Sequence, residues 1–257
     1  MSLAPVDYDF GVPANYAFAE SITCSNDEAR KMYVEAFGHM LNYNHEQAIA
    51  CFTKCAELDP NCAMAWWGIA YCLSSSYNWS AGLGPGYDAI SQAVSLKDHC
   101  SELEQDLIMA LSKRHTKEAR DNANPAALNM GNSPELNQAF ADAMAPLYEK
   151  YNGNLDVTAI YVEALMNLNP WTLWNKDAST GEITPVDDST LMLIKIMEDA
   201  FENVPGAKEH PALCHLYCHA LELSPYPERA LPAADVLRTL MPGCGHLVHM
   251  PSHIDAW

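Results

Sequence analysis

The chain has 257 residues, of which 49% are hydrophobic and 18% are charged, a composition typical of a globular protein with a large core. Its formal net charge of −19 argues against nucleic acid and anionic membranes as partners. Such a charge favours metal ions, cationic ligands, or basic proteins and peptides.

The N-terminal nine residues lack the basic region and the apolar run of a secretory signal. No segment approaches the roughly 20 apolar residues of a membrane-spanning helix. The nine cysteines form no C-x-x-C pair and occupy apolar positions of predicted helices. We therefore expect a cytoplasmic protein with reduced, mostly buried thiols and without a zinc site made of four cysteines.

Residues 1–25 show no clear hydrophobic period, and we expect an irregular lead-in there. Helical periodicity then predicts helices at about 26–43, from 45 to before Pro60, and at 61–77, 87–96, 101–114, 134–151, 155–168, 189–203, 209–223, 227–240 and 246–257. Loops are expected at 77–86, 115–133 and 169–187. No strand-like alternation of any length is present, so the sequence predicts an all-α fold.

Two stretches carry the same spacing of small and large apolar residues followed by a proline. Offsets of 0, 4, 7 and 12 hold for Ala48, Phe52, Cys55 and Pro60, and again for Ala230, Ala234, Leu237 and Pro242. In this register Trp66 falls where the next unit has its large aromatic residue. The pattern resembles the tetratricopeptide repeat (TPR), a helix–turn–helix unit of 34 residues.

This resemblance implies an all-α protein in which TPR-like repeats stack into a right-handed superhelix with long insertions between helices. The repeat domain would span 26–257, and its last repeat would be incomplete because the final helix has no partner. In the family, the first helix of each repeat lines a concave groove. That groove commonly binds a peptide or helix of a partner protein.

Histidines are concentrated near the C-terminus, in two pairs with the same spacing. His215 and His219 are four residues apart, as are His249 and His253, and the second pair follows the first by 34 residues. Side chains at i and i+4 lie one above the other on a helix, so each pair can reach one ion. Imidazole nitrogen suits copper, iron, zinc and nickel. The sequence therefore predicts a transition-metal site, for which we favour copper over iron or zinc because paired His-x₃-His motifs resemble those of dinuclear copper oxidases.

The repeat register implies that both pairs and His246 face the groove. Pro251 lies between His249 and His253 and is expected to kink their helix, which weakens the argument for that pair. Chance placement of packing histidines is the competing interpretation. His210 is more consistent with helix capping or solvent exposure than with ligation, and His99 and His115 are expected at the surface.

Weaker candidates complete the predicted site. His45 is a further ligand candidate and Glu46 a general base if a curved array brings them across the groove, although a polar start to a helix is the favoured explanation of both. Glu222 is on the groove face and is a candidate base or ligand, or a solvated helix-end charge. A substrate pocket would draw on the aromatic side chains Trp67, Tyr71, Trp171 and Trp174, although the last two also suit the anchoring of their long loop.

Three functions remain open on this basis. The first is a metal-dependent enzyme acting on a small molecule, with redox chemistry at copper as the favoured version. The second is a TPR scaffold that binds a basic protein or peptide in the groove. The third is metal storage or delivery through the same histidines.

Overall fold

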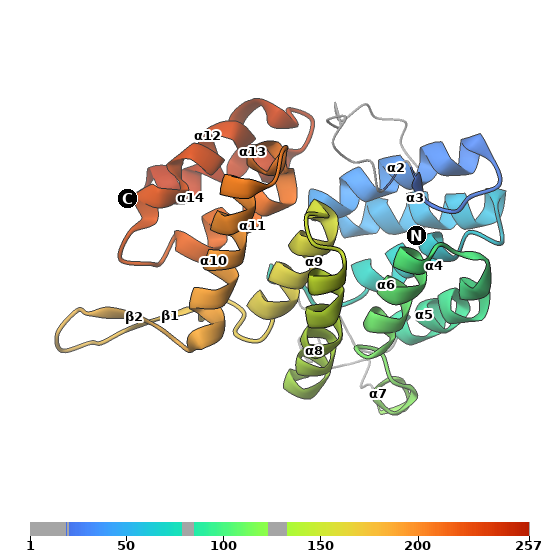
Figure 1. Ribbon diagram of the computed structural model, residues 1–257, viewed down its shortest axis with the longest axis horizontal. Helices are drawn as coiled ribbons and strands as arrows, with labels where there is room; N and C mark the ends of the chain where they lie inside the picture. The colour runs from blue at the N-terminus through green and yellow to red at the C-terminus, as the bar shows by residue number, and fades with distance from the viewer. Residues whose placement is uncertain (1–18, 20, 79–84, 123–132, 257) are drawn as a thin grey trace. The chain divides into compact units, whose positions relative to one another are not determined.

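The computed structural model describes residues 19, 21–78, 85–122 and 133–256. This part of the chain is helical apart from one short hairpin of two strands, which confirms the predicted all-α fold (Figure 1). None of its helices is long and apolar enough to cross a membrane. Most of the predicted lead-in, residues 1–18 and 20, lies outside the described residues, as do parts of the two predicted loops at 79–84 and 123–132.

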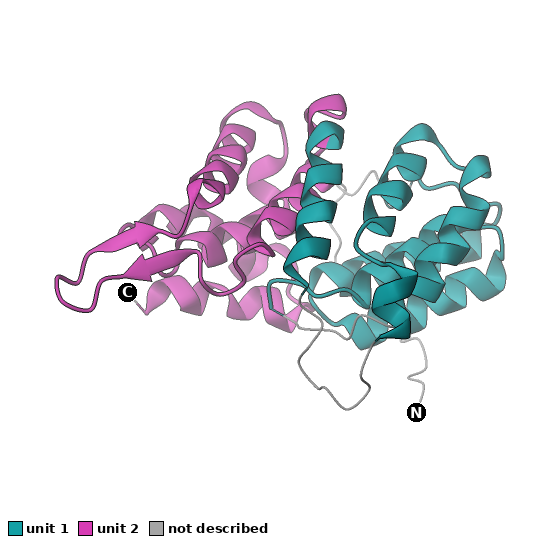
Figure 2. Cartoon of the chain, turned by 90° about the horizontal axis from the view of Figure 1, so that it is seen from below, with its two compact units in different colours: residues 1–147 teal, residues 148–257 magenta. Residues whose placement is uncertain are grey.

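The chain divides into two compact units, residues 1–147 and residues 148–257 (Figure 2). Unit 1 is built from helices that pack against their neighbours in sequence. They are α2 (Asp27–Leu41), α3 (His45–Leu58), α4 (Ala63–Cys72), α5 (Pro85–Leu96), the 3₁₀ turn η1 (Lys97–His99), α6 (Glu102–Ser112) and α7 (Lys117–Asp121). Helix α8 (Pro134–Lys150) ends just inside unit 2.

The first two helices form a hairpin whose ends are set by local hydrogen bonds. The side chain of Asn26 caps α2 by accepting from the Ala29 amide at 3.0 Å. At the other end Tyr43 adopts a left-handed conformation (φ 56°), and the Asn44 amide donates to the His39 carbonyl oxygen at 3.0 Å. The predicted boundaries at 26 and 45 are therefore confirmed within one residue.

The core of unit 1 contains the small–aromatic pattern found in the sequence. Ala48, Phe52 and Cys55 are fully buried on α3, and Phe52 packs against Tyr33 of α2 at 5.2 Å between ring centroids. The Phe52 ring also lies directly against Gly68 of α4. These contacts account for the small residues at the spacing identified above, whereas the superhelical repeat arrangement stays a prediction.

Unit 2 contains the remaining elements (Figure 1). They are α9 (Leu155–Met166), β1 (Trp174–Lys176), β2 (Ile183–Pro185), α10 (Asp188–Asn203), η2 (Ala207–Glu209), α11 (Pro211–Leu221), η3 (Pro227–Ala230), α12 (Leu231–Leu240), α13 (Gly245–His249) and α14 (Pro251–Asp255). Helix α11 packs against α9, α10, α12 and α14, and every residue from Pro211 to Leu221 is buried. It is the central helix of this unit.

The predicted loop at 169–187 contains an antiparallel hairpin that the sequence did not indicate. Strands β1 and β2 pair in the register Trp174–Pro185, Asn175–Thr184 and Lys176–Ile183. The connecting turn is closed by Asp177, whose carboxylate accepts from Ser179 and Thr180, and by Gly181 at φ 75°. Strands of three residues are too short for a period-two pattern to be recognised.

All nine cysteines are free thiols and seven are buried, as predicted. His99 is exposed as expected. The expectation for His115 was wrong, because its ring is 5% exposed and lies 2.8 Å from the Ser74 hydroxyl in unit 1.

Candidate metal centre

Helix α11 carries two histidines into the interior of unit 2. It begins with His210 as the N-cap, whose Nδ1 accepts from the Leu213 amide at 3.3 Å, and with Pro211 at its first position. The other ring nitrogen of His210 lies 3.3 Å from an Asp156 carboxylate oxygen. Both ring nitrogens are thus used, and capping is the role that the structure gives to His210. One and two turns further along, His215 and His219 are 0% and 2% exposed.

Five imidazole rings form a closed ring in this unit. Consecutive ring centroids are separated by 4.8 Å for His215–His219, 5.2 Å for His219–His253, 4.8 Å for His253–His249, 6.4 Å for His249–His246 and 4.9 Å for His246–His215. We call these five residues the histidine ring. The structure therefore brings together all four paired histidines and His246, as the sequence predicted.

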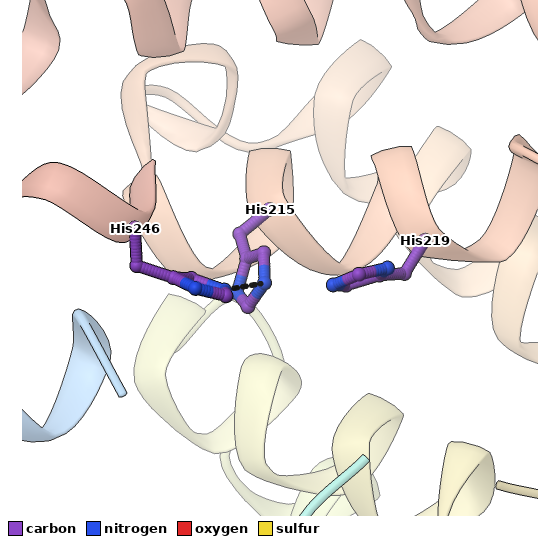
Figure 3. Close-up of side chains that lie close together, drawn as sticks. All are labelled: His215, His219 and His246. Atoms are coloured by element: carbon purple, nitrogen blue, oxygen red, sulfur yellow. Dashed lines mark hydrogen bonds between the residues drawn. The ribbon is translucent and has the colours of Figure 1, made fainter. Parts of the chain in front are cut away.

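Two contacts in the histidine ring join ring nitrogens directly. Nε2 of His246 lies 3.1 Å from Nε2 of His215, and Nε2 of His253 lies 3.0 Å from Nε2 of His249. Figure 3 shows His215 between His246 and His219, with the rings converging from α13 and α11. Two nitrogens bound to one metal at about 2.0–2.1 Å each are themselves about 3 Å apart. Both separations therefore suit a shared metal ion, and each also suits one hydrogen bond between a protonated and an unprotonated nitrogen.

Glu222, the C-cap of α11, contacts two members of the histidine ring. One carboxylate oxygen lies 2.8 Å from Nδ1 of His219, and the other is hydrogen-bonded to Nδ1 of His253. A carboxylate on Nδ1 fixes the tautomer of an imidazole and leaves Nε2 as the metal-binding atom. Glu222 is therefore placed to orient His219 and His253. It also belongs to one of the candidate ligand groups, with His219 and His253, while His215, His219 and His246 form another.

Burial controls the protonation of this centre. Burial, followed by the charges of His219 and His246, lowers the pKa of His215 well below its usual value. Burial also lowers the pKa of His219, although its hydrogen bond to Glu222 acts in the opposite direction. For Glu222, burial raises the pKa, but the hydrogen bonds and charges of His219 and His253 outweigh it and leave the pKa below its usual value. Neutral imidazoles beside an ionised carboxylate are the protonation states that metal binding requires.

Pro251 divides the last predicted helix without separating the second histidine pair. Helix α13 ends at His249 and α14 begins at Pro251, so the predicted break is present. The Leu247 carbonyl, which would have bonded to the amide that proline lacks, accepts from the Met250 amide at 3.3 Å. The expected loosening of the pair is absent, since His249 and His253 remain 3.0 Å apart at Nε2.

The histidine ring is buried on one side and open on the other. His215 and His219 are inaccessible, His246 and His253 are partly exposed, and His249 is exposed. Structural zinc sites are usually closed, whereas catalytic sites keep a position open for water or substrate. Of the five rings, that of His249 is thus the most exposed to solvent.

Of the four predicted pocket aromatics, Trp171 is the one that lies beside the histidine ring. It is 49% exposed, contacts His219 edge to face at 5.5 Å, and has a left-handed backbone (φ 62°) that is strained for a bulky residue. Trp174 instead anchors the hairpin, because its indole N–H donates to the Ala220 carbonyl oxygen at 2.7 Å.

The other predicted site residues belong to unit 1. His45 begins α3, where it stacks on Tyr43 at 5.4 Å, and Glu46 is exposed. Neither is in a candidate ligand group of the described residues. Trp67 is 1% exposed, donates to the Leu107 carbonyl oxygen at 3.2 Å and packs on the half-buried Tyr71 at 5.1 Å. The structure thus corrects the expectation that Trp67 lines an open substrate pocket, because α4 turns this residue into the core.

Comparisons with known proteins add no identification. No protein-family model matches the chain, and no significant match was found among curated proteins or solved structures. The function therefore has to be argued from the chemistry of the histidine ring.

Proposed function

We propose that unit 2 binds a transition metal through the histidine ring and that the protein is a metal-dependent oxidoreductase, with copper favoured over iron and zinc. The observation that carries the proposal is the closed arrangement of five imidazoles, in which two Nε2–Nε2 pairs are separated by 3.1 and 3.0 Å. Figure 3 shows three of the five, His215, His219 and His246. His215, His219 and His246 are the first ligands, because their ligand atoms all lie within 4.8 Å of one another. His249 and His253 would complete this site or hold a second ion.

The competing explanation is a chain of hydrogen bonds between histidines. It accounts for each nitrogen pair separately, since one ring can donate to the next. It leaves unexplained why polar rings from three helices face one another beside α11, which is buried along its whole length and where apolar packing costs less. A metal ion supplies one partner for all of them and accounts for the orientation of His219 and His253 by Glu222.

The choice of redox chemistry rests on the ligands and on Glu222. An all-imidazole site suits copper, and divalent copper binds nitrogen ligands more tightly than iron or zinc does. Hydrolysis would need a base beside the metal to activate water. The carboxylate that lies there has one oxygen on His219 and the other on His253, so it is already committed. A small-molecule substrate would reach the centre beside His249 and Trp171.

Storage or delivery of the metal is the second candidate. The exposed position of His249 favours it, because a ligand at the surface can transfer an ion to an acceptor protein. Catalytic turnover distinguishes the oxidoreductase from a protein that stores or delivers metal, because delivery requires no turnover.

Metal content and oxygen consumption test the proposal together. The full chain would be purified without chelators, loaded with Cu²⁺, Fe²⁺ or Zn²⁺ and measured by inductively coupled plasma mass spectrometry. We expect near-stoichiometric copper that is lost when His215→Gln and His249→Gln are combined, while His99→Gln, at an exposed site of unit 1, retains it. Copper-loaded protein should also consume O₂ with ascorbate as electron donor. Equal metal content in the double variant would refute the site, and bound copper without O₂ consumption would refute the redox function in favour of delivery.

A further inference from the structure

A second group of potential metal ligands lies in unit 1 and shares no member with the histidine ring. Glu35, His39 and Cys51 are 7%, 4% and 0% exposed, and their ligand atoms all lie within 4.8 Å of one another. Glu35 and His39 are four residues apart on α2, and Cys51 is on α3. The sequence contains the i, i+4 pair as a signal, but one carboxylate and one histidine are too common a combination to be noticed without Cys51.

The helix hairpin fixes these three side chains. Residues at i and i+4 project from one face of α2, and the turn at Tyr43 folds α3 back onto that face. Glu35 and His39 are therefore held on one helix while Cys51 approaches from the other. The three ligands come from rigid elements and not from a mobile loop, which is the arrangement that precise metal geometry needs.

Neighbouring side chains contact two of the three potential ligands. The Nδ2 atom of Asn44 lies 3.3 Å from Nδ1 of His39 and donates to it when that ring nitrogen is unprotonated. The Gln47 amide donates to Sγ of Cys51 at 3.8 Å.

We propose that Glu35, His39 and Cys51 form a second metal site, which binds Zn²⁺ and cross-links α2 to α3. Zinc follows from the ligand types, because thiolate and imidazole select borderline-soft ions, while Mg²⁺ and Ca²⁺ take oxygen ligands. The site differs from the histidine ring by its sulfur ligand, and it does not depend on the function proposed for unit 2.

Because it contains a sulfur ligand, the proposed site can be measured separately from the histidine ring. The reduced, metal-free full chain would be titrated with Co²⁺ alone, a spectroscopic substitute for Zn²⁺. We expect a thiolate-to-cobalt charge-transfer band in the near ultraviolet, which saturates at one equivalent per chain and disappears when Zn²⁺ is added. His215→Gln removes a nitrogen ligand of unit 2 and leaves this band unchanged.

Variants on α2 and α3 assign the ligands. Cys51→Ser should abolish the band, while Cys55→Ser, one turn further along α3 and equally buried, should retain it. Glu35→Gln keeps the thiol and the side-chain volume, and we expect its Co²⁺ affinity to fall at least about 10-fold with an unchanged far-ultraviolet circular dichroism spectrum. The proposal is overturned if the wild type shows no such band, if Cys51→Ser retains it, or if Glu35→Gln binds Co²⁺ as tightly as the wild type.

Discussion

Glu222 is the residue on which the orientation of the histidine ring depends. Its two oxygens contact Nδ1 of His219 on α11 and Nδ1 of His253 on α14. One carboxylate therefore links the two helices and sets the tautomer of one histidine from each pair. The sequence offered Glu222 as a base, a ligand or a solvated charge, and positioning of the two histidines accounts better for both contacts.

Substitution of Glu222 by Gln should weaken metal binding without unfolding the protein. The amide group of Gln presents its own N–H to one of the two rings, so one histidine loses its acceptor and its preferred tautomer. We expect the affinity for Cu²⁺ or Zn²⁺ to fall about 10–100-fold, measured by competition with a chromophoric chelator. Glu209→Gln, at an exposed position just before α11, is the matched control. Equal affinities for wild type and Glu222→Gln would show that this carboxylate has no positioning role.

His115 is a buried histidine of unit 1 that belongs to neither proposed metal site. Burial, followed by the positive charge of Arg114, lowers its pKa from 6.5 to about 4. In the unfolded chain His115 takes up a proton near pH 6.5, while in the folded protein it resists protonation until about pH 4. Stability from this residue is therefore complete above pH 6.5 and is lost as the pH falls towards 4.

The pH dependence of the free energy of unfolding should reveal this difference between the pKa of His115 in the folded and unfolded states. In chelator-treated wild-type protein we expect His115 to account for a loss of up to about 3 kcal/mol between pH 6.5 and pH 4. His115→Gln removes that part of the pH dependence, and His99→Gln, at an exposed site, leaves it. Urea unfolding at a series of pH values measures both. Parallel profiles for wild type and His115→Gln would contradict the assignment.

At the scale of single residues, the sequence predicted the candidate metal ligands better than it predicted the residues that contact them. The spacing of His215, His219, His249 and His253 was enough to expect convergence, because helical geometry follows directly from sequence separation. Contacts between elements, such as Glu222 with His253, depend on how helices pack, which spacing does not encode. The burial of Trp67 was missed for the same reason.

At the scale of elements, α3 and α4 approach each other closely where Phe52 meets Gly68. A Cβ atom on Gly68 would lie 2.5 Å from Cζ of Phe52, whose ring is fully buried. Glycine is thus required here by the space that Phe52 occupies, although it is unfavourable inside a helix. The contact gives a physical reason for the alternation of small and large residues in this part of the sequence.

Substitution of Gly68 by Ala should destabilise the protein, although a Gly→Ala change inside a helix usually stabilises it. In an open helix, Gly→Ala stabilises by about 0.5–1 kcal/mol. At Gly68 we expect a loss of about 1–3 kcal/mol, because the added methyl group displaces Phe52 from a packed core. Gly245→Ala, where the methyl group would meet open space at the start of α13, should be neutral or stabilising. Thermal unfolding of both variants checks the contrast, and a stabilising Gly68→Ala would contradict the packing described.

Helix positions were largely predictable, because hydrophobic period, caps and prolines all act locally. The predicted start at Ser101 corresponds to a capping box in which Ser101 and Glu104 bond each other's backbone amides. The hairpin of β1 and β2 was not predictable, since its strands are held by Trp174 bonding to Ala220 and by Thr190 bonding to Leu173. Those are tertiary contacts with no local signature.

At the scale of the whole molecule, the two proposed sites belong to different units. The histidine ring lies in unit 2, and the Glu35–His39–Cys51 group lies in unit 1. The net charge of −19 favours the approach of cations to both. The chain divides into two compact units. The single repeat domain over 26–257 that the resemblance to TPR proteins implies stays a prediction. Whether the units stack as a superhelix stays a prediction.

Hydrogen exchange should show two separate regions of protection. A ligand that binds only the native state raises the free energy of local opening around its site. We expect added Zn²⁺ to slow exchange in α11, α13 and α14 and in α2 and α3, and to leave α6 unchanged. Mass spectrometry of peptides from each helix measures this. Uniform protection across both units, or none, would argue against two local sites.

An anomalous difference map tests the central claim most directly. Crystals of the full chain grown with Cu²⁺ would be measured above and below the copper absorption edge. The account predicts a peak within the histidine ring, above the edge only, bonded at about 2.0–2.1 Å to Nε2 of at least three of its histidines, a distance typical of imidazole ligands. Peaks confined to surface carboxylates, or a histidine ring without any peak at saturating copper, would contradict it.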